Sequence, residues 1–156
     1  YEDLIRVPLI IWGYQNSIID SVVSTIDIAP TLLDLLGIQK PKMYLGRNLL
    51  ETEEFRIIFS ETARIDFRFN VDYARFTLAT IVWPWKFILS TFNRSIELYN
   101  LEKDPSERNN VVFQYRDLVK ELLGIAMKHL KRSREFRSRM NVIKRIKKKI
   151  RSREFK

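Results

Sequence analysis

The stretch ELYNLEKDPSERNN, residues 97–110, joins two kinds of local structure. Up to Asn100 it is rich in apolar and aromatic residues, which is typical of a strand. Pro105 fixes its own backbone and keeps the residue before it out of the helical region, so the chain turns here. Asp104 and Asn110 have short polar side chains that can accept hydrogen bonds from nearby backbone N–H groups. The stretch therefore predicts a strand, a tight turn and then a helix.

Four short segments rich in aromatic and β-branched residues surround the start of this stretch. They are residues 55–60, 73–80, 86–92 and 95–100, and turn-like gaps separate them. Segments of this composition and length are typical of strands, and the two-residue gap at Asn93-Arg94 is short enough for a hairpin. We therefore expect a small antiparallel sheet.

Beyond Asn110, apolar residues recur every three or four positions, as on one face of a helix. Asn109 or Asn110 can cap its first turn. We expect this helix to pack across the small sheet. Its apolar positions are Val111, Val112, Tyr115, Leu118, Val119, Leu122, Leu123, Ala126 and Leu130.

The N-terminal part has a different pattern. Residues 7–12, VPLIIW, form a continuous apolar run, which predicts a buried strand of an α/β sheet with both faces covered. A helix follows, with Asp27 as its N-cap, Pro30 in its first turn and Gly37 at its end. Its apolar stripe consists of Ile28, Leu32, Leu35 and Leu36.

Composition excludes sites built from cysteine, and the charged residues show where the positive charge lies. The chain has 156 residues and no Cys, which excludes disulfides, iron–sulfur clusters and thiolate zinc sites. The net charge of +9 is uneven: residues 128–156 hold 14 Lys or Arg and two acids, whereas residues 1–127 hold 14 and 17. The basic character therefore belongs to the C-terminal end.

This basic end leaves three interpretations open. It is a solvated tail, an interfacial helix on anionic lipid supported by Met140, Ile143 and Ile150, or a nucleic-acid-binding segment. Nucleic acid is the weakest of these partners, because the sequence has no recognisable nucleic-acid-binding fold. The candidate anion-binding residues are Lys144, Arg145, Lys147, Lys148 and Lys149.

Four segments resemble, in the same order, segments of type I sulfatases of the alkaline phosphatase superfamily. Residues 1–11 resemble a "YE…RVPLII" strand, residues 23–37 a "DIAPTLLDLAG" helix and residues 46–50 a "G.SL" loop. Residues 97–110 resemble "ELYDL…DP.E..N", with Asn100 where Asp is usual. The motif residues with an expected structural role are Glu97, Leu98, Tyr99, Asp104, Pro105, Glu107 and Asn110.

The resemblance implies an α+β chain that is the C-terminal part of a sulfatase. Residues 1–54 would complete the α/β catalytic-type domain, residues 55–130 would form a subdomain of small antiparallel sheet plus helix, and residues 131–156 would be a basic tail. The implied partner is the missing N-terminal catalytic portion.

The resemblance also implies a reaction, namely metal-dependent hydrolysis of a sulfate ester. Sulfatases use a Cys or Ser in a C/S-x-P-x-R motif together with Ca²⁺ or Mg²⁺, because the charge on the ester oxygens must be stabilised as the bond breaks. This sequence has no such motif. We therefore assign no catalytic or metal-binding residue and no cofactor to this chain, and expect it to be inactive alone. The alternative is a non-catalytic module that binds an anionic surface through its basic tail.

Other conspicuous residues have plainer interpretations. His129 has no second ligand at a suitable spacing and reads as a histidine on a helix. We interpret Asp27 as a helix cap and Asp34 as a solvent-facing acid. We expect residues 83–86, WPWK, to pack in the core of the sheet. A further hypothesis places three arginines at the mouth of the parent active site: Arg64, Arg68 and Arg75.

Overall fold

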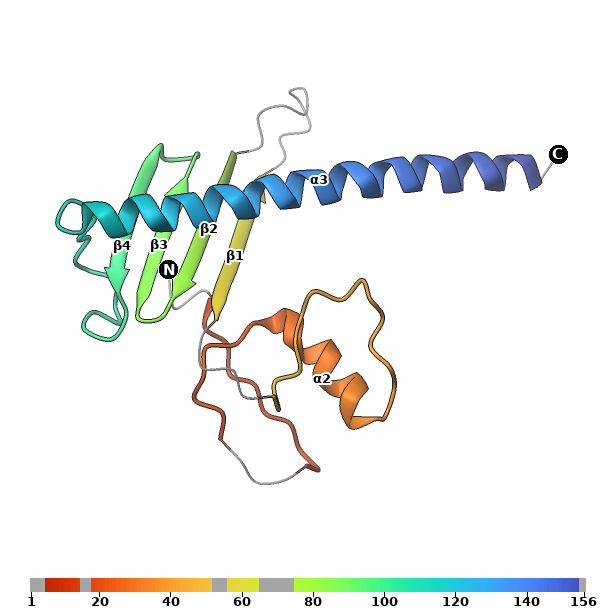
Figure 1. The fold of residues 1–156 in the computed structure, drawn as a ribbon, viewed down its shortest axis with the longest axis horizontal. Coiled ribbons are helices and arrows are strands. Elements are labelled where there is room, and N and C mark those ends of the chain that lie inside the picture. The colour runs from red at the N-terminus through yellow and green to blue at the C-terminus, as the bar shows by residue number, and fades with distance from the viewer. Residues whose placement is uncertain (1–4, 15–17, 52–55, 65–74, 155–156) are drawn as a thin grey trace. The chain divides into compact units, whose positions relative to one another are not determined.

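The computed structural model describes residues 5–14, 18–51, 56–64 and 75–154. These residues form two compact units, one up to Gln114 and one from Tyr115 onward. The first unit contains the sheet and the short helices, and the second contains one long helix (Figure 1).

The sheet has four antiparallel strands in sequence order, β1 (Ile57–Arg64), β2 (Arg75–Val82), β3 (Trp85–Ser90) and β4 (Ser95–Asn100). Figure 1 shows them side by side in this order. The predicted sheet is confirmed, with strand ends shifted by a few residues. Phe87 lies opposite Thr80 on one side and Leu98 on the other, and all three are fully buried. On the other face of the sheet, Ala79, Ile88 and Tyr99 form a second buried cluster.

The short helices are the 3-10 helix η1 (Thr25–Asp27) and α2 (Ile28–Leu35). As predicted, Gly37 ends α2 in the left-handed conformation, with φ of 67°. The N–H of Ile38 donates to the carbonyl of Leu33 at 2.8 Å, and that of Gly37 to Asp34 at 2.9 Å. These two bonds satisfy the last free carbonyls of the helix, as in a Schellman motif.

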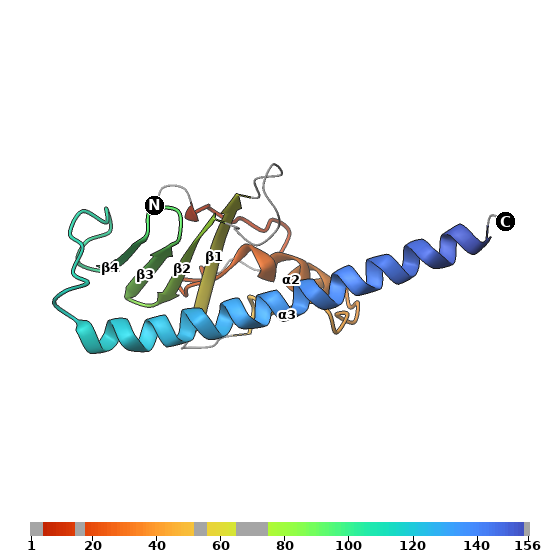
Figure 2. The same ribbon diagram turned by 90° about the horizontal axis from the view of Figure 1, so that it is seen from above.

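The long helix α3 spans Arg116–Glu154 without a break (Figure 2). Its predicted start near Asn110 is wrong, because residues 112–114 form a turn and the Asn110 side chain is hydrogen-bonded to Leu98 and Val112. The helix also continues past residue 131, where the sequence suggested a separate tail. Its packing across the sheet and the three predicted domain ranges stay predictions. None of the described helices is both long and apolar enough to cross a membrane.

The strand predicted at residues 7–12 is not formed. Ile10 and Trp12 are 89% and 81% exposed. A strand that is apolar on both faces needs neighbouring strands and covering helices, and the four described strands all belong to the antiparallel sheet. The fold class is nevertheless confirmed as α+β, with a four-stranded antiparallel sheet and helices.

Candidate functional site

Asp27 is the centre of a buried polar network where η1 passes into α2. Its carboxylate is fully buried. One oxygen accepts the N–H of Ser24 at 2.8 Å, and the other accepts the N–H of Arg47 at 2.9 Å. The Arg56 guanidinium donates to both oxygens, with Nη2 2.6 Å from Oδ1. The carboxylate thus joins η1, the loop at residue 47 and the start of the sheet.

The predicted capping role of Asp27 needs correction. Its side chain makes no cap hydrogen bond to the first turn of α2, and instead bonds back to Ser24. The reason is the arginine 29 positions later, which competes for both carboxylate oxygens. Burial alone would raise the pKa of Asp27, but the hydrogen bonds from Arg56 and from the backbone N–H groups of Arg47 and Ser24 outweigh burial and lower the pKa.

The loop of residues 46–50 is attached to α2 by a second set of bonds. Thr31 is fully buried, and its hydroxyl donates to the carbonyl of Asp27 at 2.7 Å. The same hydroxyl accepts the N–H of Leu49 at 2.9 Å. Lys40 Nζ donates to the Gly46 carbonyl at 3.1 Å. The segment that resembles "G.SL" is therefore a structural strap across the helix.

Gly46 is required by close backbone packing. A Cβ at this position would lie 1.9 Å from the carbonyl oxygen of Ile26. We expect Gly46→Ala to lower the free energy of unfolding by about 1–3 kcal/mol, because the strap must move away from the helix. Gly124→Ala is the matched control, since a Cβ there meets nothing within 4 Å; it should stabilise helix α3 by about 0.5–1 kcal/mol. Urea unfolding measures both, and equal effects of the two variants would contradict this account.

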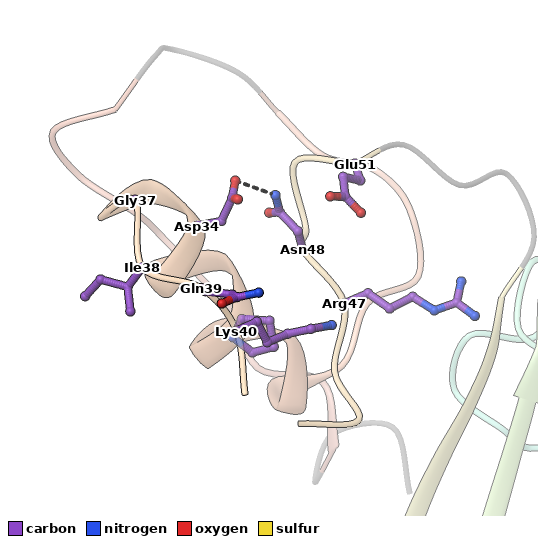
Figure 3. Close-up of a pocket in the computed structure, with 9 residues that line it drawn as sticks. Asp34, Gly37, Ile38, Gln39, Lys40, Arg47, Asn48 and Glu51 are labelled. Carbon is purple, nitrogen blue, oxygen red and sulfur yellow. Dashed lines mark hydrogen bonds between the residues drawn. The ribbon is translucent and has the colours of Figure 1, made fainter. Parts of the chain in front are cut away.

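An open groove of about 740 Å³ lies between the end of α2 and the strap. Figure 3 shows Asp34 and Asn48 facing each other across it, with Asn48 Nδ2 2.8 Å from Asp34 Oδ2. The charged residues that line it are Asp34, Lys40, Arg47 and Glu51, two of each sign. This balance of charges selects neither an anion nor a cation. Asp27 and Asp34 do not act as a pair, because Asp34 is hydrogen-bonded to Asn48 and Asp27 to Arg56.

The described residues do not form a site for a divalent metal ion. Across 5–14, 18–51, 56–64 and 75–154, no three His, Cys, Asp or Glu side chains gather as ligands. A metal with hard oxygen preference needs several such oxygens on one centre. We derive no chemical step through a metal in this chain.

The turn after β4 has the side-chain hydrogen bonds expected of it. Asp104 accepts the N–H groups of Arg108 at 3.1 Å and Asn109 at 2.8 Å. Asn110 Oδ1 accepts those of Leu98 at 3.0 Å and Val112 at 3.1 Å.

Asn100, where the motif usually has Asp, still bonds to the turn. Its Oδ1 accepts the N–H groups of Glu102 at 3.1 Å and Lys103 at 3.0 Å. An amide oxygen can accept these two bonds as a carboxylate oxygen would, so the substitution keeps this part of the turn.

Two glutamates of the same motif interact with side chains of the sheet. The Tyr99 hydroxyl donates to Glu97 at 2.8 Å. Glu107, with φ of 52°, forms a buried ion pair with Lys86 of β3, in which Nζ and Oε1 are 2.8 Å apart. The two side chains are 0% and 2% exposed. Among the other motif residues Leu98 is buried and Pro105 is exposed.

Sequence reasoning missed the two cations that neutralise these buried acids. Arg56 lies before the first strand, and Lys86 follows an aromatic run, where a charge is usually expected on the solvated face. The predicted core role of residues 83–86 is wrong for Trp83, which is 55% exposed in the turn between β2 and β3. Glu107 would have indicated a nearby cation only if its burial had been known, since a buried acid needs a counter-charge.

The other candidate residues lie apart from this network. His129 is half-buried within α3. Arg64 and Arg75 are paired positions at the ends of β1 and β2, and Arg68 lies outside the described residues. The candidate anion-binding residues are all in the last part of α3: Lys144, Arg145, Lys147, Lys148 and Lys149.

Comparison with known proteins gives consistent matches. Residues 1–135 match the family described as N-sulphoglucosamine sulphohydrolase, C-terminal. The chain is 33% identical over 123 residues to the uncharacterized sulfatase YidJ of Escherichia coli, covering 74% of this chain and 24% of YidJ. It is 30% identical over 136 residues to arylsulfatase K of Bos taurus, covering 78% and 25%.

A solved structure matches in fold. It is a 2-O GAG sulfatase with a TM-score of 0.57 and 23% identity, and the match covers 72% of this chain and 26% of that one. The chain therefore spans about a quarter of the length of the relatives it matches.

Proposed function

We propose that this chain, which belongs to the N-sulphoglucosamine sulphohydrolase C-terminal family, works as the non-catalytic C-terminal portion of a sulfatase-like hydrolase. The whole protein would cleave a sulfate ester with water, giving an alcohol and sulfate. The names of the family and of a solved relative point to a sulfated sugar as its substrate class. The rest of such a protein would supply the nucleophile and a Ca²⁺ or Mg²⁺ site.

The observation that carries this proposal is the exposure of the N-terminal apolar surface. Among the residues whose side-chain burial the structure describes, which end at residue 135, 21 large hydrophobic residues are exposed, and 15 of them lie between Val7 and Leu45. So many exposed apolar side chains in one stretch of the sequence favour an interaction site. In the sheet and its turns, in contrast, the large hydrophobic residues described as exposed are only Trp83, Phe92 and Ile96.

Helix α2 shows the same feature most clearly. A surface helix normally turns its apolar stripe to the core. Here the buried residues of α2 are Pro30 and Thr31, Ile28 and Leu35 are half-buried, and Leu32 and the adjoining Leu36 are 43% and 71% exposed. Leu32 and Leu36 of the stripe are therefore available to a partner.

An α/β sheet is the partner that fits both features. Residues 7–12 have the composition of a strand covered on both faces, and α2 follows them as a covering helix would. The relatives are about four times longer than the matched part. We infer that the N-terminal catalytic portion of a sulfatase provides this sheet, and that the Asp27 network holds α2 in position for docking.

The chain alone is expected to show no sulfatase activity. The sequence has no Cys, and the described residues gather no set of metal ligands, so nothing in them stabilises the charge of a departing sulfate. The assay measures turnover of an aryl sulfate by the purified chain with Ca²⁺ or Mg²⁺ added. Turnover that depends on the metal and is abolished by a chelator would contradict the proposal.

A further inference from the structure

Helix α3 extends beyond the part of the chain that matches the family. The match ends at residue 135, and the helix continues to Glu154. Residues 136–156 contain ten Lys or Arg and one Glu. The proposed sulfatase role does not explain this extension.

The charges of this extension repel one another along the helix. Lys144 and Lys148, and likewise Arg145 and Lys149, are separated by four residues, so they are neighbours on the helix surface. Like charges at this spacing destabilise a helix, and screening by salt relieves only part of the repulsion. A surface with many negative charges would attract these cations and offset the repulsion between them.

The apolar positions of the extension share one side of the helix. At 3.6 residues per turn, Met140, Ile143, Ile146 and Ile150 fall within about a third of the circumference. Lys144 and Lys148 fall on the remaining part. A narrow apolar stripe in a strongly basic helix is the pattern of helices that lie in a membrane interface.

We propose that residues 136–154 of α3 bind the surface of a bilayer that contains anionic phospholipid. The basic positions attract the headgroups and the isoleucine positions enter the acyl boundary. Charge favours lipid over a second copy of the chain, since two such helices would repel each other. The isoleucine stripe favours lipid over nucleic acid, because binding to phosphates through charge alone requires no apolar side chains.

Cosedimentation with vesicles tests this proposal. The intact chain should bind vesicles of phosphatidylcholine with about 30% phosphatidylglycerol, and should bind pure phosphatidylcholine at least about tenfold more weakly. A variant with Lys144, Arg145, Lys147, Lys148 and Lys149 each replaced by Gln should bind the anionic vesicles about a hundredfold more weakly, because each basic residue near the surface contributes to attraction.

The matched control removes the same charge from elsewhere. It replaces Lys42, Lys103, Arg108, Lys120 and Lys128, all of which are exposed, by Gln. Its binding should stay within about threefold of the intact chain, because attraction falls off within a Debye length of the surface. Equal loss in the two variants would mean that net charge alone acts, and would overturn the proposal.

Labelling tests insertion without removing any of these cations. The chain has no Cys, so Ile146→Cys can carry a single polarity-sensitive dye. Its emission should shift to the blue on anionic vesicles, and a dye on Asn141→Cys, about 140° around the helix from residue 146, should shift much less. Equal shifts would overturn the interfacial helix, and so would tighter binding to a DNA duplex that is unaffected by Ile143→Ser with Ile150→Ser.

Discussion

Replacing Arg56 with alanine is expected to lower the free energy of unfolding by about 3–5 kcal/mol, because it leaves a buried carboxylate without its counter-charge. Asp27 is fully buried, and the Arg56 side chain is only 15% exposed. The two remaining backbone donors, from Ser24 and Arg47, cannot neutralise the charge. Urea unfolding of the chain measures the change.

Arg47→Ala is the matched control for this variant. The Arg47 side chain is exposed, and the residue reaches Asp27 through its backbone N–H, which alanine keeps. We expect a change within about 1 kcal/mol, as for an ordinary surface substitution. A loss in Arg47→Ala as large as in Arg56→Ala would show that the guanidinium–carboxylate contact is not what stabilises the network.

The same network gives stability a dependence on pH. The folded-state pKa of Asp27 lies below the ordinary value of an aspartate carboxyl group. Its contribution is therefore present above that value and is lost as the pH falls through the folded pKa. Arg56→Ala should reduce this loss in acid, so the difference in stability between the intact chain and the variant should shrink below about pH 4.

Glu107→Ala is the second change with a large expected effect. It leaves Lys86 charged in a fully buried position of β3, and we expect a loss of about 3–5 kcal/mol. Because Glu107 ties the turn after β4 to the middle of the sheet, hydrogen exchange should rise first in β3 and β4. Thermal and urea unfolding measure the loss.

A double variant separates the charge from the packing. Lys86→Met with Glu107→Leu replaces the pair by apolar side chains of similar size. It should recover most of the stability lost in Glu107→Ala, since well-packed apolar pairs often replace buried ion pairs at no net cost. If the double variant is as unstable as Glu107→Ala, the pair is needed for more than neutralising a buried charge.

The features that could be predicted from the sequence are those set by local chemistry. The strands follow from aromatic and β-branched composition, and the end of α2 follows from Gly37. Asp104 accepts hydrogen bonds from backbone N–H groups four and five residues further on, so the turn at Pro105 was also predictable.

The features that could not be predicted depend on distant parts of the chain. Asp27 looks like a cap until Arg56, 29 residues away, is placed beside it. Lys86 looks like a surface cation until Glu107 is brought onto it. The start of α3 was misjudged because Asn110 is drawn back to β4. Pairings over such separations are set by tertiary packing and leave little trace in local pattern.

The strand expected at residues 7–12 shows a different limit. Its apolar pattern is that of a buried strand, but in this structure Ile10 and Trp12 are exposed and no strand forms. The pattern is that of a strand within a sheet covered on both faces, and the described residues do not supply such a sheet. The proposed docking onto an α/β catalytic portion accounts for both the pattern and the exposure.

Hydrogen exchange in a chimera tests this central claim most directly. The chimera is the Escherichia coli relative YidJ with this chain in place of the quarter of YidJ that it matches. We expect the amides of residues 9–12 to exchange at least about a hundredfold more slowly in the chimera than in the chain alone, because they become paired in a sheet. Unchanged exchange at residues 9–12, in a chimera whose β3 amides remain protected, would contradict it.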